Sequence, residues 1–126
     1  MRIKEIVFDA EHPAGLARFW AAAVADYAVR AYDAAEIARL AAAGYTPETD
    51  PTVMVDGPGP SLCFQKHPPL HTGRNPVHLD LVGGDRPSEI ALLVALGASV
   101  RDEGEHHTVM LDPEGNQFCV QDPSRA

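Results

Sequence analysis

Two polar side chains spaced two residues apart, His78 and Asp80, are the first candidates for chemistry in this sequence. They lie in NPVHLDLVGGD, residues 75–85, where polar and apolar residues alternate. Alternate residues of a strand point to opposite faces, so His78 and Asp80 share one face and Leu79 and Leu81 the other. An imidazole can donate, accept or bind a metal, and a carboxylate can accept protons. The polar face therefore predicts contact with solvent, a metal ion or a small molecule.

Length, composition and charge limit the classes of protein to consider. The chain has 126 residues, of which 45% are hydrophobic, and this predicts a single domain over 1–126 with its own core. The net charge of −8 argues against a nucleic-acid partner, which needs a basic stripe. No apolar run approaches the roughly 18 residues of a membrane helix. Two cysteines and a start without an apolar block predict a cytoplasmic protein.

The first half of the chain predicts strands, two helices and a hairpin. Leu16, Phe19 and Trp20 have the spacing of one apolar helix stripe. Asp33 and Glu36 have the spacing of a capping box, which predicts the start of a second helix. In order, we expect a strand at 3–9, a helix at 13–25, a short strand at 26–32, a helix at 33–44, and a hairpin of strands 51–57 and 60–67. The turn at 46–51, with Glu48 and Asp50, is expected to be a solvated loop or a cover for a binding site.

The second half repeats the order of strand, helix and strands. We expect a strand at 77–82, a helix from Asp85 to Gly97 with an apolar stripe of Ile90, Leu93, Val94 and Leu96, and strands at 98–104, 106–112 and 117–122. LCFQ at 62–65 aligns with FCVQ at 118–121, and Glu5 aligns with His78. The repeat indicates an internal duplication. The fold class it predicts is α+β, with two βαβββ modules: module one at 1–68 with an inserted helix at 33–44, and module two at 75–126.

Four strands of this arrangement are expected to turn a polar face the same way. The apolar faces, which would pack against the helices, carry Ile6, Phe8, Leu62, Phe64, Leu79, Leu81, Phe118 and Val120. The opposite faces carry Glu5, Cys63, Gln65, His78, Asp80, Gln117, Cys119 and Gln121. A curved sheet with helices outside would enclose these polar residues in a cleft, which is typical of a small-molecule site.

Three motifs add a family resemblance to this pattern. HPAGLARFW follows the first strand, VHLDL opens the second half and DPEGNQFCV closes it. With the duplicated βαβββ order, they resemble the vicinal oxygen chelate superfamily, and within it the single-domain glyoxalase-like and bleomycin-resistance-like proteins. The resemblance covers nearly the whole chain apart from the insertion at 33–50. It implies two modules that curl into one cleft, and a homodimer.

The resemblance also implies where a metal would be held. Metal-dependent members of the superfamily place four ligands on the first and last strands of the modules, and these positions fall here on Glu5, Cys63, His78 and Cys119. His78 matches the expected histidine and Glu5 is an acceptable oxygen ligand, whereas Cys119 replaces an expected glutamate and Cys63 departs likewise. Thiolate, imidazole and carboxylate can together hold zinc. Buried cysteines, however, commonly serve only as small packing residues.

Three hypotheses about function remain open at this stage. The favoured one is a cleft in which Glu5, Gln65, His78, Asp80 and Gln121 bind a small molecule for a resistance or carrier role, with no cofactor required. The alternative is a lyase, isomerase or dioxygenase with one divalent metal (zinc, nickel, manganese or iron). Its substrate would offer two neighbouring oxygens, and Glu5 or Asp80 would be the catalytic group that moves a proton. The third is structural, with His78 hydrogen-bonded in a polar core.

Overall fold

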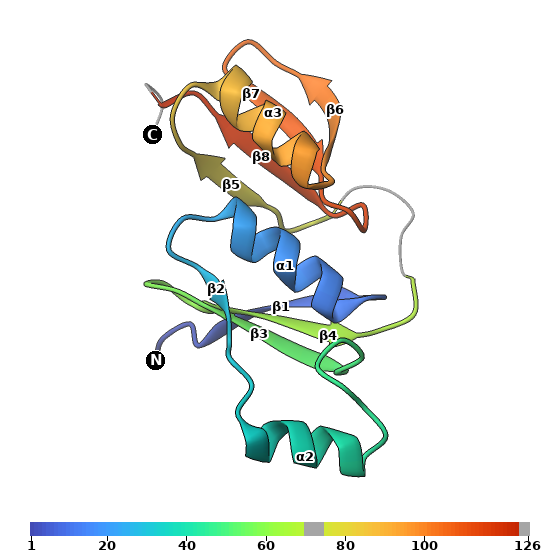
Figure 1. The fold of residues 1–126 in the computed structure, drawn as a ribbon. Helices are drawn as coiled ribbons and strands as arrows, with labels where there is room; N and C mark the ends of the chain where they lie inside the picture. Colours follow the sequence, from blue (N-terminus) through green and yellow to red (C-terminus); the bar gives the residue numbers. More distant parts are fainter. Residues whose placement is uncertain (70–74, 124–126) are drawn as a thin grey trace. The chain divides into compact units, whose positions relative to one another are not determined.

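The structure is a computed structural model, and it describes residues 1–69 and 75–123. Contacts within the chain divide it into two compact units, Met1–Leu70 and His71–Ala126. Each unit contains a four-stranded mixed sheet together with helices (Figure 1). The elements follow the order β-α-β-β-β in each, with one extra helix in the first unit. The predicted α+β fold of two βαβββ modules is confirmed.

The first unit is built on the sheet order β1-β4-β3-β2. Strands β3 and β4 form an antiparallel hairpin, and β1 lies parallel to β4. Its elements are β1 (Glu5–Ala10), α1 (Pro13–Ala23), β2 (Ala28–Val29), α2 (Ala34–Ala42), β3 (Thr52–Asp56) and β4 (Ser61–Lys66). The short strand expected at 26–32 has only two residues, and Asp26 adopts a left-handed conformation (φ 64°) just before it.

Helix α1 covers one face of this sheet and forms the core of the unit. Leu16, Phe19 and Trp20 are buried, as their spacing predicts. The Trp20 ring lies 5.4 Å from the Phe8 ring of β1, and Phe8 stacks on Phe64 of β4 at 4.9 Å. Aromatic rings at such distances add to the stabilisation from apolar burial. The packing leaves the other face of the same sheet free for polar residues.

The inserted helix α2 lies on the side of the sheet away from α1 (Figure 1). Its start follows the predicted capping box, since Asp33 accepts a hydrogen bond from the Glu36 backbone N–H at 2.8 Å. Gly44, with φ 88°, follows its last turn. Leu40 is the one buried residue of the helix. Because so short a helix is marginal in isolation, we expect α2 to depend on the packing of Leu40 and on its cap at Asp33.

The second unit has the sheet order β5-β8-β7-β6. Its elements are β5 (Leu79–Val82), α3 (Arg86–Leu96), β6 (Ser99–Glu103), β7 (His107–Leu111) and β8 (Gln117–Gln121). Asp85 caps α3 by accepting from the Ser88 N–H at 3.1 Å, and Gly97 ends the helix with φ 119°. Strand β5 lies parallel to β8, as β1 does to β4 in the first unit.

The apolar stripe expected for α3 is wrong in part. Leu93 is buried, but Val94 and Leu96 are 48% and 44% exposed, and Leu92 is 63% exposed. The segment IALLVAL is apolar on all sides, so its periodicity does not single out one buried face.

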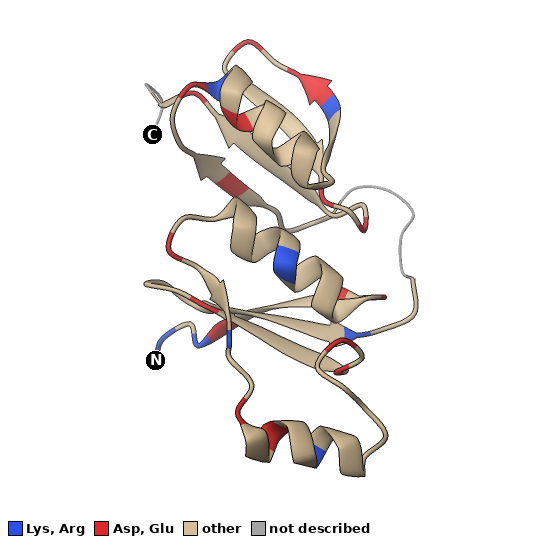
Figure 2. Ribbon diagram, viewed as in Figure 1, with Lys and Arg blue, Asp and Glu red and all other residues tan. Residues whose placement is uncertain are grey.

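Charged residues are scattered over both units, and Lys and Arg do not gather into a stripe (Figure 2). Within residues 1–69 and 75–123, no helix has both the length and the apolar character that crossing a membrane requires.

Candidate functional site

The polar face of the second unit is formed by the parallel strands β5 and β8. Their register pairs Asp80 with Cys119 and Leu79 with Phe118. The expectation that His78 belongs to the strand is wrong, because β5 begins at Leu79. The register of β5 and β8 begins with the pair Leu79–Phe118. One residue before Phe118, the backbone N–H of Gln117 donates a hydrogen bond to the Asn75 side chain at 3.0 Å.

Asp80 nevertheless joins the predicted polar residues of this face. Its Oδ1 lies 3.3 Å from Nε2 of His78, and its Oδ2 accepts a hydrogen bond from Nε2 of Gln121 at 2.7 Å. The side chains of His78 and Asp80 are 32% and 50% exposed. Partly exposed polar contacts add little to stability. This set is therefore accessible to a ligand, and we expect it to contribute little to the stability of the fold.

Cys119 completes a group of possible metal ligands with the same two residues. The candidate atoms of His78, Asp80 and Cys119 all lie within 4.8 Å of one another. Imidazole nitrogen, carboxylate oxygen and thiolate sulfur suit zinc, and three protein ligands are typical of a catalytic zinc site. The donors therefore fit a metal, provided that the buried Cys119 thiol ionises. Sequence reasoning missed Asp80 as a metal ligand, although strand alternation already placed it beside His78.

The matching face of the first unit lies on β1 and β4. Their parallel register pairs Val7 with Cys63 and Asp9 with Gln65. The Gln65 side chain donates to Oδ1 of Asp9 at 2.9 Å. Asp9 is a partner that the sequence analysis did not include among the site residues, although it alternates with Glu5 along the same strand. Gln65 is thus already held by a carboxylate on its own face.

Glu5 and Cys63 interact electrostatically on this face. Burial raises the pKa of the Cys63 thiol, and the negative charge of Glu5 raises it further, while Lys4 and Arg30 oppose the shift. A raised pKa keeps the thiol protonated, whereas a metal ligand must be a thiolate. Among the described residues, Cys119 but not Cys63 belongs to a group of three close donors, so Cys63 is the weaker metal-ligand candidate.

The two parallel registers support the alignment of Glu5 with His78. Cys63 pairs with Val7, two residues after Glu5, and Cys119 pairs with Asp80, two residues after His78. The two residues therefore hold equivalent positions in their modules. Their approach to each other across a shared cleft stays a prediction.

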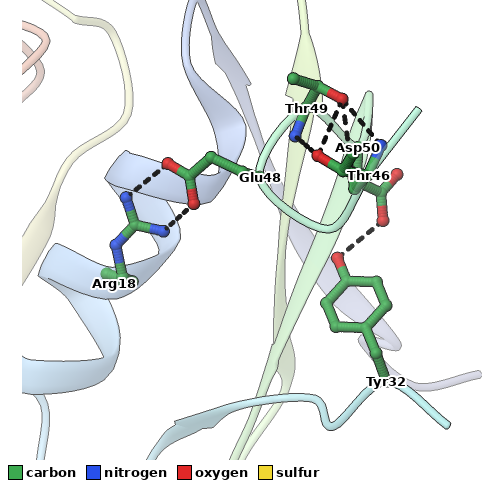
Figure 3. A network of polar contacts seen from close by, with 6 residues as sticks. All are labelled: Arg18, Tyr32, Thr46, Glu48, Thr49 and Asp50. Atoms are coloured by element: carbon green, nitrogen blue, oxygen red, sulfur yellow. Dashed lines mark hydrogen bonds and ion pairs between the residues drawn. The ribbon is translucent and has the colours of Figure 1, made fainter. Parts of the chain in front are cut away.

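The turn before β3 differs from the solvated loop expected at 46–51. Glu48 is exposed and forms a double hydrogen bond with Arg18 of α1, at 2.7 and 2.8 Å. Asp50, in contrast, is only 6% exposed and accepts a hydrogen bond from the Tyr32 hydroxyl at 2.7 Å (Figure 3). The prediction is wrong for Asp50, because its tyrosine partner is distant in sequence.

Comparisons with known proteins agree with this geometry. A family model described as "Glyoxalase-like domain" matches residues 5–121. Solved structures with the same fold include a glyoxalase/bleomycin resistance protein/dioxygenase family enzyme from Burkholderia phytofirmans PsJN. Its sequence is 13% identical, the match covers 97% of this chain and 98% of that chain, and the TM-score is 0.69. The trypanothione-dependent glyoxalase I of Leishmania major matches at 12% identity over 99% and 88% of the chains, with a TM-score of 0.62.

A glyoxalase/bleomycin resistance protein from Albidiferax ferrireducens T118 also matches, at 14% identity over 94% and 96% of the chains, with a TM-score of 0.57. At these identities the structural matches establish the fold alone. Among curated proteins, none matches the sequence. The family model, which spans most of the chain, and the two βαβββ modules lead to one conclusion: the protein belongs to the glyoxalase-like domain family of the vicinal oxygen chelate superfamily.

Proposed function

We propose that this protein binds a small molecule on the polar faces of its two sheets and needs no metal to do so. The residues that would contact the ligand are Glu5, Gln65, His78, Asp80 and Gln121. The observation that carries the proposal is the position of Asp80 between His78 and Gln121, at 3.3 and 2.7 Å, on a partly exposed face. Polar groups held in place by their neighbours can orient a ligand without reorganising.

The chemistry of these groups indicates what the ligand must offer. The amide oxygen of Gln121 and the Nδ1 of His78 remain for hydrogen bonds to a ligand. Val7, beside Glu5 on the first face, is 49% exposed and offers an apolar surface. An aromatic or antibiotic-like compound with polar substituents would suit this mixture, in a resistance or carrier role.

The grouping of His78, Asp80 and Cys119 favours a second candidate function, a metal-dependent lyase, isomerase or dioxygenase. These three residues would hold a zinc, nickel, manganese or iron ion, with the thiolate favouring zinc. When bound, the metal would act as a Lewis acid towards two neighbouring oxygens of a substrate. With Asp80 engaged as a ligand, Glu5, the other carboxylate proposed for catalysis, would move the proton.

Metal analysis and ligand binding on the same protein separate the two candidates. Untagged protein is analysed for bound metals, then compared before and after treatment with EDTA for binding of aromatic probes, including catechol. The metal-free proposal predicts equal binding in both samples and no thermal stabilisation by zinc, nickel, manganese or iron. Stoichiometric metal in the untreated protein, with binding lost in EDTA and in Cys119→Ser, would overturn it in favour of the enzyme.

A homodimer and a cytoplasmic location also remain predictions. Light scattering of the purified protein would test the dimer, for which the expected mass is twice the 13.5 kDa of the chain.

A further inference from the structure

An edge strand of the second unit adds a guanidinium group to the polar face of its sheet. In this sheet β7 separates β6, at the edge, from β8 (Figure 1). Nη1 of Arg101 on β6 donates a hydrogen bond to Oε1 of Gln117 on β8 at 3.3 Å. Gln117 lies two residues before Cys119 on the same strand, so their side chains share one face. The Arg101 side chain therefore crosses β7 on the polar face and ends beside β8.

An irregularity of β6 accompanies this orientation of Arg101. Val100 pairs with Met110 of β7, whereas Asp102 pairs with the preceding residue, Val109. Strand β6 thus contains one residue more than β7 at this point, and that residue is Arg101. A β-bulge of this kind changes the direction of a side chain, and bulges are over-represented next to active sites. The bulge is therefore a second feature, besides the contact with Gln117, that associates Arg101 with a functional face.

Apolar side chains of β7 lie on this face between β6 and β8. Val109 pairs with Cys119, and Leu111 pairs with Gln117. Both apolar residues are partly buried, whereas Met110 between them is fully buried on the opposite face. An aromatic ring can pack on such an apolar surface. The polar face therefore contains a platform for a ring, with the Arg101 side chain reaching over it from the edge strand.

Most of the hydrogen-bonding capacity of Arg101 is left for a ligand. A guanidinium carries five N–H donors. Within residues 1–69 and 75–123, its one hydrogen bond is the bond to Gln117. Its Nε lies 3.7 Å from Oδ2 of Asp102, which is an ion pair but too long for a hydrogen bond. Because the Arg101 side chain is 40% exposed, its remaining donors are accessible to an acceptor oxygen.

The charges of this face favour a neutral acceptor over an anion. Arg101 is the only Lys or Arg within strands β5 to β8 as the structure describes them. Asp102 balances its charge, and Asp80 adds a second carboxylate to the face. An anionic ligand would approach both carboxylates. A carbonyl oxygen, in contrast, accepts a hydrogen bond from a guanidinium without adding negative charge, and bonds of this charge-assisted kind are the stronger ones.

We propose that Arg101 is a further ligand-binding residue of the polar-face site, and that it selects aromatic ligands that carry a ketone or another neutral carbonyl group. The ring lies on Val109, and the carbonyl oxygen accepts a hydrogen bond from Nη2 of Arg101. This inference rests on the proposed function, because it adds one contact to the same site. The bond to Gln117 holds the guanidinium in place before the ligand arrives, which lowers the entropic cost of binding.

The experiment compares two probes, 4-hydroxyacetophenone and 4-ethylphenol, which differ only in whether a C=O or a CH₂ group is attached to the ring. Both are titrated into the EDTA-treated full chain labelled with ¹⁵N. We expect wild type to bind the ketone about tenfold more tightly, and the Nε–H signal of Arg101 to shift with the ketone. Arg101→Met, which keeps the length of the side chain and removes its donors, should lower the affinity for the ketone about tenfold.

Two controls show whether this loss is specific. The affinity of Arg101→Met for 4-ethylphenol should change less than twofold, which also shows that the variant keeps its folded face. Arg18→Met removes an exposed arginine of the first unit that is ion-paired with Glu48, and it should change the affinity for neither probe.

The possible outcomes separate the role of Arg101 from the site itself. Equal affinity of wild type for the two probes, or a preference for the ketone that persists in Arg101→Met, would reject the role of Arg101 and leave the proposed site in place. Loss of both probes in Arg101→Met would also reject it, because the contact would not be specific for the carbonyl group. If wild type binds neither probe, or if His78→Ala binds both as wild type does, the proposed site is wrong and the inference about Arg101 is wrong with it.

Discussion

Replacing Tyr32 with phenylalanine should destabilise the first unit through the loss of a single hydroxyl. The hydroxyl donates to the buried carboxylate of Asp50 at 2.7 Å, and hydrogen bonds to charged groups contribute about 1.5–3 kcal/mol. Tyr32 is only partly buried, so water replaces some of this interaction, and Asp50 keeps its bond from the Thr52 N–H. We therefore expect the free energy of unfolding to fall by about 1.5 kcal/mol at pH 7.

The pH dependence of this loss follows from the pKa of Tyr32. Burial raises the pKa of the Tyr32 phenol, and the hydrogen bond to Asp50 raises it further, from an ordinary value of 10.0. The folded chain thus holds this proton more tightly than the unfolded chain, whose phenol ionises near pH 10. The stabilisation is complete below that pH and is lost as the pH rises above it. The difference between wild type and Tyr32→Phe should therefore shrink above pH 10.

Urea unfolding at a series of pH values measures both effects. Tyr27→Phe is the matched control, because the Tyr27 hydroxyl donates to a neutral acceptor, the Pro60 carbonyl, at 3.0 Å, and its loss should cost about 1 kcal/mol. In wild type, absorbance at 295 nm should show one of the three tyrosines ionising well after a free phenol. Equal stability of Tyr32→Phe and wild type at pH 7, or a difference that stays constant from pH 8 to 11, would refute the reasoning.

Two further predictions concern groups with few solvent contacts. Arg86 lies 2.8 Å from Asp122, and their side chains are only 17% and 25% exposed. Arg86→Met should therefore lower the free energy of unfolding, measured in urea, by about 2–3 kcal/mol. A loss below about 0.5 kcal/mol would contradict this prediction. In a Cys119→Ser background, iodoacetamide should alkylate Cys63 slowly at pH 8, and Glu5→Gln should speed the reaction because it removes a charge that raises the thiol pKa. Slower alkylation in Glu5→Gln would contradict the expected interaction.

Features that depend on neighbours in sequence were predictable. The caps at Asp33 and Asp85 each involve a backbone N–H three residues further on, so the local motif already contains both partners. The polar and apolar faces of β5 and β8 followed from strand alternation, and the register bears them out. Periodicity also identified the buried stripe of α1, because the only large apolar side chains of that helix, Leu16, Phe19 and Trp20, fall on one side of it.

Features that depend on distant partners were not predictable from the sequence. The acceptor for Tyr32 lies 18 residues away, and nothing in the turn TPETDP indicates which of its acidic residues is buried. The hydrogen bond from the Gln117 N–H to the Asn75 side chain, just before β5 begins, joins residues 42 apart and has no local sequence signal. The partial exposure of α3 was not predictable either. A helix that is apolar on all sides can pack against the sheet with any of its faces, so its sequence does not indicate which face is buried.

The polar-face ligand site is tested most directly by mapping a bound aromatic probe on EDTA-treated, ¹⁵N-labelled protein. A probe that binds should shift the signals of His78, Asp80 and Gln121 together with those of Glu5. His78→Ala should abolish this binding and lower the free energy of unfolding by less than about 1 kcal/mol, because its contact with Asp80 is partly exposed. Leu79→Ala, on the apolar face, should keep the binding and cost about 2 kcal/mol. If His78→Ala binds the probe as wild type does and loses as much stability as Leu79→Ala, His78 is a structural residue and the proposed site is wrong.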